Sequence, residues 1–102
     1  MLKHIEDTNE FLEAIKGKKV LVDFFAVWCG PCNALGPILE KIASEHEDID
    51  IIKIDVDKAP EIASKYGIQS IPTLILFEEG KAVDMRVGYL PEESLLRFAK
   101  LK

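Results

Sequence analysis

Two cysteines separated by two residues carry the clearest chemistry in this chain. Cys29 and Cys32 are its only cysteines and lie in the segment Trp28-Cys29-Gly30-Pro31-Cys32. An apolar run precedes them and an amphipathic helical pattern begins near Cys32, so the pair falls where a strand feeds a helix. The first N–H groups of a helix have no intrahelical partner and carry positive partial charge, and both features favour a thiolate. The pair is therefore predicted to switch between a dithiol and a disulfide.

The two cysteines are expected to differ in role. Cys29 is predicted to be the nucleophile, exposed at the helix cap with its sulfur near the backbone N–H of Cys32. Cys32 is predicted to lie inside the first turn and to be more buried. Gly30 brings no charge and Pro31 has no N–H to donate, so the thiolate is stabilised less than it would be beside a histidine. A weakly stabilised reduced form makes the couple a reductant, which favours disulfide reduction over disulfide formation.

Two other uses of the cysteine pair are weaker alternatives. A static disulfide closing four residues gains little entropy, and cytosolic chemistry opposes it. A structural zinc needs four ligands, and only His4 and His46 could join the pair, at no familiar spacing. No metal or other cofactor is expected.

The bulk composition is that of a single soluble domain spanning 1–102. The 102 residues are 48% hydrophobic and 30% charged, with a formal net charge of −5. The acidic balance, without a basic cluster, argues against a nucleic-acid partner. No apolar run approaches the ~20 residues of a membrane span, and the first residues lack the apolar core of a signal peptide. A monomer in the cytoplasm is the default expectation.

Apolar periodicity and turn residues predict nine elements. The predicted strands cover residues 3–5, 19–26, 49–55, 73–77 and 82–87. The predicted helices cover 7–17, 32–46 and 59–66, and a last one is opened by Pro91. The first is capped by Asp7, with Glu10 as reciprocal partner, and ends at Gly17. The second is expected to kink at Pro37, and the third is closed by Gly67. The order is βαβαβαββα. It predicts an α/β fold with a five-stranded mixed sheet and helices on both faces.

The chain resembles the thioredoxin family along nearly its whole length. Beyond the cysteine segment, the resemblance rests on Asp23 six residues before Cys29, Lys53 in a later strand, Ile71-Pro72-Thr73, and Gly88 after the last strand. It implies the thioredoxin fold and a redox carrier with general protein-disulfide reductase activity. The implied partners are disulfide-containing client proteins and a flavin- or iron–sulfur-dependent thioredoxin reductase. The chain departs from the common family pattern at Val27 and Asn33.

Asp23 interrupts an otherwise apolar strand. Burial makes a carboxyl costly to ionise, so its pKa is expected to be raised. Such a group could take the proton from Cys32, directly or through water. Alternatively, Asp23 could be a strand-end residue bonded to backbone. The resemblance implies the catalytic role and pairs Lys53 with Asp23, although on spacing alone Lys53 could be a solvated strand residue.

A second group of residues is expected to bind the client. The resemblance implies a cis peptide before Pro72, against the cysteine pair, with Ile71 offering backbone groups to an extended segment, as in strand addition. An ordinary trans proline is the alternative. Gly30 and Pro31 are assigned to the same surface. An apolar collar is expected from Trp28, Gly67, Ile68, Gly88 and Tyr89, although Ile68 and Tyr89 could instead be partly core.

Two other functions fit the same residues. Some proteins of this family serve as assembly subunits independently of their thiols. Others of the same fold are oxidases or isomerases, against which Gly30-Pro31 argues.

Overall fold

The computed structural model describes residues 1–102 as one sheet with helices on both faces. The five strands are β1 (Leu2–His4), β2 (Lys19–Phe25), β3 (Asp50–Asp55), β4 (Thr73–Glu78) and β5 (Lys81–Val87). They are arranged in the order β1-β3-β2-β4-β5. β1, β3 and β2 run parallel, and β4 and β5 add antiparallel strands. The predicted βαβαβαββα order and mixed sheet are confirmed.

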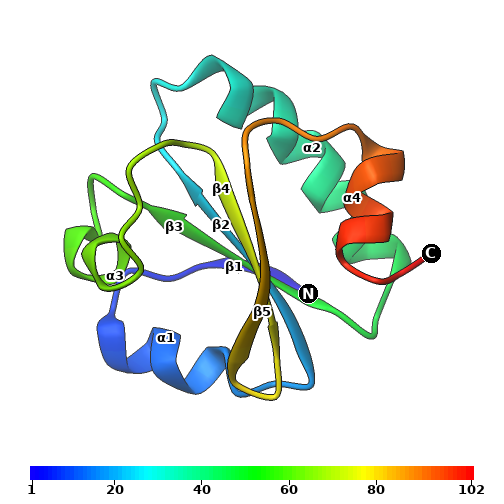
Figure 1. Ribbon diagram of the computed structural model, residues 1–102, viewed down its shortest axis with the longest axis horizontal. Helices are drawn as coiled ribbons and strands as arrows, with labels where there is room; N and C mark the ends of the chain where they lie inside the picture. The colour runs from blue at the N-terminus through cyan, green and yellow to red at the C-terminus, as the bar shows by residue number, and fades with distance from the viewer.

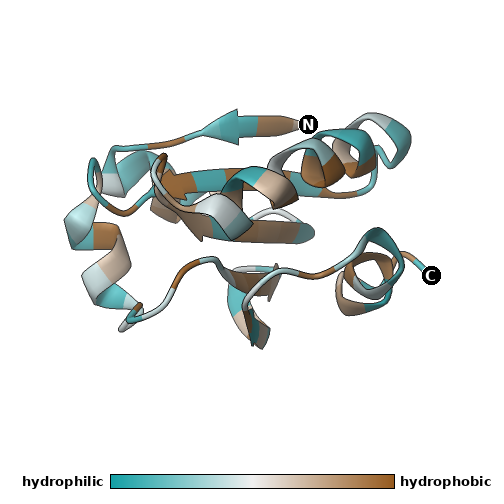
Figure 2. Ribbon diagram, turned by 90° about the horizontal axis from the view of Figure 1, so that it is seen from above, coloured by the Kyte–Doolittle hydropathy of each residue, from teal (hydrophilic) through white to brown (hydrophobic).

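Helices cover both faces of the sheet (Figure 1). α1 (Thr8–Ala14) and α3 (Pro60–Lys65) lie on one side, and α2 (Gly30–Glu45) and α4 (Glu92–Phe98) on the other. Each side has its own apolar core, and Figure 2 shows hydrophobic residues gathered on the central strands. Because successive strand residues point to opposite faces, one strand serves both cores.

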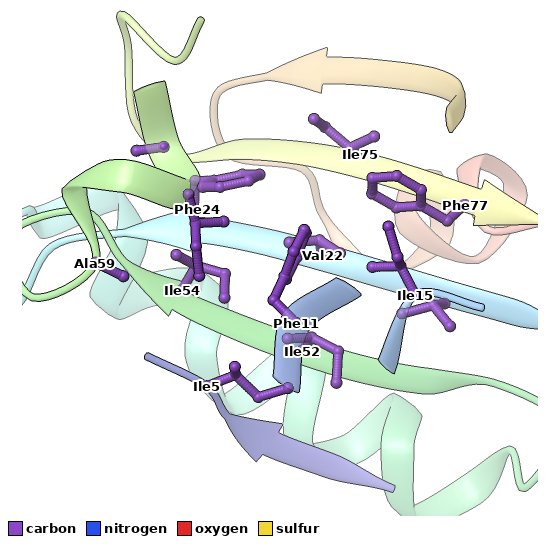
Figure 3. Close-up of a cluster of buried hydrophobic side chains, with 13 residues drawn as sticks. Ile5, Phe11, Ile15, Val22, Phe24, Ile52, Ile54, Ala59, Ile75 and Phe77 are labelled. Carbon is purple, nitrogen blue, oxygen red and sulfur yellow. The ribbon is translucent and has the colours of Figure 1, made fainter. Parts of the chain in front are cut away.

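β2 is the central strand and positions the chemistry. Val22 and Phe24 point into the core beneath α1, where they pack with Phe11 and Ile52 (Figure 3). Leu21 points into the opposite core, beneath α2 and α4. Asp23, two residues after Leu21, therefore faces the side covered by α2.

Several element ends differ from the sequence prediction. α2 begins at Gly30 rather than Cys32 and continues through Pro37 to Glu45. Pro91 is the N-cap of α4, one residue before the helix starts. The Glu79-Gly80 turn has positive φ at both residues, as a type I′ two-residue hairpin turn requires. Glu78 therefore pairs with Lys81, and β5 starts one residue earlier than expected.

The expected capping box at α1 is only half formed. The Asp7 carboxylate accepts the backbone N–H of Glu10 at 2.8 Å, as predicted. The reciprocal bond from the Glu10 side chain is absent, because that carboxylate pairs with Lys3 at 3.6 Å instead.

Candidate active site

The cysteine pair sits where β2 turns into α2. Cys29 is the helix N-cap, in extended conformation, and its sulfur accepts the backbone N–H of Cys32 at 3.3 Å. Pro31 occupies the first turn, where a missing N–H breaks no intrahelical bond. The predicted arrangement of a capping Cys29 and a Cys32 inside the first turn is confirmed.

Cys29 and Cys32 are joined by a disulfide, with their Cα atoms 5.2 Å apart. The expectation that Cys29 is exposed is wrong, because the residue is only 6% exposed, against 1% for Cys32. Cys29 packs with Phe25 and Ala26, and Val56 and Ile71 lie against the same cluster. The order of accessibility is as predicted, but only a small part of Cys29 reaches solvent.

The segment before β4 lies against Cys29. The Cys29 sulfur is 3.9 Å from the carbonyl oxygen of Ile71, and the Ile71–Pro72 peptide is cis, as the resemblance implied. On the other side of Pro72, the Gly88 N–H donates to the Pro72 carbonyl at 2.8 Å. Gly88 has φ +102°, a conformation that L side chains rarely adopt. The structure thus brings together Cys29, Ile71, Pro72 and Gly88.

Trp28 is the most exposed aromatic residue beside the disulfide, at 70%. Its indole N–H donates to the Asp57 carboxylate at 2.8 Å. The Asp57 backbone N–H in turn donates to the Asp55 side chain at 2.9 Å. Nothing in the sequence predicts this role for Asp57, because it lies 29 residues from Trp28 in a loop with no motif of its own.

The rest of the expected collar is only partly assembled. Tyr89, Gly30 and Pro31 are exposed. Ile68 is half-buried and packs against the core beneath α1 and α3, so the alternative reading of this residue is correct in part. Gly67 and Ile68 line a hollow of about 220 Å³ with Met85 and Val87.

Asp23 is fully buried, and neither of its carboxylate oxygens has a hydrogen-bond partner. Lys53 Nζ lies 3.7 Å from Asp23 Oδ2, which is an ion-pair distance but too long for a hydrogen bond. Burial raises the pKa of Asp23 from 3.8 to about 6, and the positive charge of Lys53 offsets part of that rise. The alternative in which Asp23 bonds to backbone is therefore wrong.

Lys53 is not a solvated strand residue either. Its side chain is 12% exposed, and Nζ lies 4.4 Å from the centre of the Phe25 ring. Helix α2 passes over it at Gly36, where a Cβ would come within 3.8 Å of Nζ. Gly36 lies one helical turn after Cys32, so the stretch of α2 that begins at Cys32 reaches over the ion pair.

The structure gathers no group of three or more His, Cys, Asp or Glu side chains that could hold a metal ion. The zinc alternative therefore has no ligand set here. None of the helices combines the length and the apolar character that crossing a bilayer requires.

A disulfide-forming pair at the N-terminus of the helix that follows the central strand, with a buried carboxyl beneath that helix, defines a dithiol–disulfide oxidoreductase. The thioredoxin family model matches residues 2–101. Thioredoxin of Mycoplasmoides gallisepticum is 47% identical over 100 residues, covering 97% of this chain and 100% of the relative. Thioredoxin of Alicyclobacillus acidocaldarius is 50% identical over 93 residues, covering 89% and 88%.

Solved structures agree with the sequence comparisons. A mutant thioredoxin from Halobacterium salinarum superposes with a TM-score of 0.92 at 36% identity, covering 98% of this chain and 88% of that one. Plasmodium falciparum thioredoxin superposes with a TM-score of 0.90 at 33% identity, covering 97% of each chain. The chain belongs to the thioredoxin family. It is a protein-disulfide reductase that cycles between dithiol and disulfide through Cys29 and Cys32. Membership of the family implies redox partners such as reductases and disulfide-containing substrates.

Proposed function

We propose a division of roles among the site residues in this exchange. In the reduced protein the Cys29 thiolate attacks one sulfur of a client disulfide. A mixed disulfide forms, and the second client sulfur leaves as a thiolate. The Cys32 thiolate then attacks the Cys29 sulfur, closing the disulfide and releasing the first client sulfur. The client gains two electrons, and the cysteine pair loses two.

The observation that carries this assignment is the position of the Cys29 sulfur. It lies within 3.3 Å of the backbone nitrogen of Cys32, whose N–H stabilises negative charge on it, and it is the less buried of the two. Cys32 is almost fully enclosed and suits the second, intramolecular step.

Asp23 is proposed as the base for that second step. Its pKa of about 6 allows it to hold a proton near neutral pH, unlike an ordinary aspartate. Lys53 acts as a positioning residue, because its charge limits how far burial raises the pKa of Asp23. The Cys32 thiol proton would pass to Asp23, directly or through water, as Cys32 attacks.

Clients are proposed to bind as an extended segment across the Ile71 backbone. The Cys29 sulfur and the Ile71 carbonyl oxygen are 3.9 Å apart. A client segment that pairs with the Ile71 backbone like an added strand would therefore hold its disulfide beside Cys29. The surrounding contacts are assigned to Trp28, Gly30, Pro31, Gly67, Ile68, Pro72, Gly88 and Tyr89.

The electron donor is proposed to be a thioredoxin reductase. The acidic net charge of −5 makes a nucleic-acid partner unfavourable. A monomer in the cytoplasm, acting away from membranes, suits a carrier that must meet both a reductase and many clients. A close cysteine pair used in this way also needs a compartment that supplies reducing equivalents.

The roles of the two cysteines are tested by trapping the mixed disulfide. Reduced Cys32→Ser protein, mixed with insulin, is expected to accumulate a covalent adduct that dithiothreitol releases and mass spectrometry locates at Cys29. Cys29→Ser is the matched control and is expected to form no adduct and to reduce no insulin. An adduct on Cys32 in the Cys29→Ser protein, with none in Cys32→Ser, would reverse the assignment.

A further inference from the structure

β5 is a free edge of the sheet and carries an exposed apolar stripe. It pairs only with β4 and is the last strand on one side of the sheet (Figure 1). Val83, Met85 and Val87 are 45%, 53% and 60% exposed. A free edge strand with apolar side chains is a template for pairing with another strand.

The direction of the backbone groups along β5 follows from its pairing with β4. The Gly88 N–H donates to Pro72, so positions 88, 86 and 84 form the hydrogen-bonded pairs of the antiparallel ladder. The alternate positions, Met85 and Val87, must then point their N–H and C=O groups outward, away from β4.

The outward N–H and C=O groups of Met85 are both hydrogen-bonded by the side chains of its two neighbours. The Asp84 carboxylate accepts the Met85 N–H at 2.8 Å, and the Arg86 guanidinium donates to the Met85 carbonyl at 3.1 Å. Asp84 and Arg86 also pair with each other at 3.1 Å. We name these two side chains the edge clasp, because together they occupy both hydrogen-bonding groups of one edge residue.

β5 is self-complementary about that same residue. In an antiparallel pair of β5 strands centred on Met85, the two Met85 residues exchange both hydrogen bonds. Val83 of each copy faces Val87 of the other, which joins the two apolar stripes. Asp84 of each copy faces Arg86 of the other, so both ion pairs of the clasp re-form between copies. A register centred on Asp84 instead sets the two Asp84 carboxylates against each other.

We propose that the β5 edge is an interaction surface for a second copy of this chain, held closed in the monomer by the edge clasp. Pairing through Met85 requires the very N–H and C=O groups that Asp84 and Arg86 occupy. The closed monomer and the β5-paired dimer therefore exclude each other. The Asp84–Arg86 ion pair forms within one copy in the monomer and between the two copies in the dimer. Both clasp side chains are solvent-exposed, at 41% and 53%, so the clasp is weak and the balance responds to small changes. The bulge opposite Leu76 and Phe77 adds twist and further disfavours pairing in the unmodified chain.

The test opens the clasp and measures self-association. D84T/R86T removes both capping side chains without changing the net charge, and threonine suits strand positions and cross-strand pairing. By sedimentation equilibrium, the dimer dissociation constant of D84T/R86T is expected to be at least about tenfold lower than that of the unmodified chain, a shift of ~1.4 kcal/mol. Adding M85K is expected to reverse the gain, because it sets two like charges opposite each other at the symmetry axis.

The matched control is E13T/K16T. It removes another exposed ion pair, 3.1 Å long, between Glu13 on α1 and Lys16 in the turn after it, with the same zero change in net charge. It is expected to leave association unchanged. Unaltered association of D84T/R86T, association that survives M85K, or equal association of E13T/K16T would each overturn the proposal.

A measurement on the unmodified chain keeps the proposal testable even where D84T/R86T folds poorly. Raising its concentration into the millimolar range is expected to slow amide exchange at Met85 and Val87 more than elsewhere. Concentration-dependent protection on another element, or none on β5, would contradict the assigned surface.

Discussion

Asp23 and Lys53 are register partners on the adjacent strands β2 and β3, and they form an ion pair without a hydrogen bond. Lys53 Nζ stands 3.7 Å from Asp23 Oδ2, in a region that α2 covers. Burial raises the pKa of Asp23 to about 6, and Lys53 offsets only part of that rise. This geometry keeps a proton acceptor beneath the helix that carries Cys32.

Asp23→Asn is expected to stabilise the oxidised protein at neutral pH. The pKa of Asp23 is higher in the folded state, about 6, than its ordinary 3.8. Its contribution to stability is therefore full below pH 3.8 and is lost as the pH rises through about 6. A neutral amide avoids that loss, and the gain at pH 7 is at most about 3 kcal/mol, from 1.36 kcal/mol per pKa unit.

Denaturant melts of oxidised wild type and Asp23→Asn between pH 3 and 8 measure this difference. The gain is expected to shrink toward zero below about pH 4, where both side chains are neutral. Asp55→Asn is the matched control, since Asp55 is also buried but accepts the N–H groups of Asp57 and Lys58, and it is expected to give no gain. A less stable Asp23→Asn protein at pH 7 would mean that the carboxylate is a satisfied structural group.

Lys53→Met is expected to raise the pKa of Asp23 above its present value of about 6. The cation is the only group that lowers this pKa, so its loss leaves desolvation unopposed. NMR titration of the Asp23 side-chain carbon measures the shift directly. Lys58→Met removes the same charge from an exposed position and is expected to leave the titration nearly unchanged; an unchanged titration in Lys53→Met would remove Lys53 from the proposed mechanism.

In the reduced protein, iodoacetamide is expected to modify Cys29 at least about tenfold faster than Cys32. Cys29 is the more accessible residue, and its sulfur faces the free N–H of Cys32 at the helix N-terminus. Peptide mapping of partially alkylated protein gives the two rates. Since the enclosed position of Cys32 accounts for the difference, denatured protein is the control and is expected to label both cysteines alike. Equal rates in the native protein would contradict the roles assigned to the two thiols.

Asp57→Asn is expected to weaken client binding with little change in the rate of exchange. The bond from the Trp28 indole to the Asp57 carboxylate, 2.8 Å long, holds an exposed ring beside the disulfide. Asparagine keeps an acceptor oxygen but not its charge, which weakens the bond by about 1 kcal/mol, so KM is expected to rise roughly fivefold while kcat stays near its original value. Insulin reduction kinetics measure both constants.

Fluorescence of Trp28, the only tryptophan in the chain, reports independently on the position of the ring. Asp57→Asn is expected to change its emission, whereas Asp48→Asn, an exposed aspartate remote from Trp28, is not. A changed emission with an unaltered KM would show that the ring is held by Asp57 but does not contact the client.

Much of this protein was predictable because its signals are local. The order of strands and helices follows from apolar periodicity and from turn residues such as Glu79-Gly80. The redox chemistry follows from two cysteines placed where β2 runs into α2. The predictions that were wrong concern the ends of elements, as at Gly30, and the exposure of Cys29. Both depend on what packs against the residue rather than on its neighbours in sequence.

By itself, the sequence determined the fold class, the position of the dithiol at a helix N-terminus and the buried character of the strand that holds Asp23. Only the tertiary structure decided that Lys53 pairs with Asp23 without a hydrogen bond, that Asp57 holds Trp28, and that Asp84 and Arg86 close the outward groups of Met85. The reason is physical. Periodicity reports which face of an element is buried, whereas the distance between two charged or polar groups depends on how strands register and on which side chains the loops bring together.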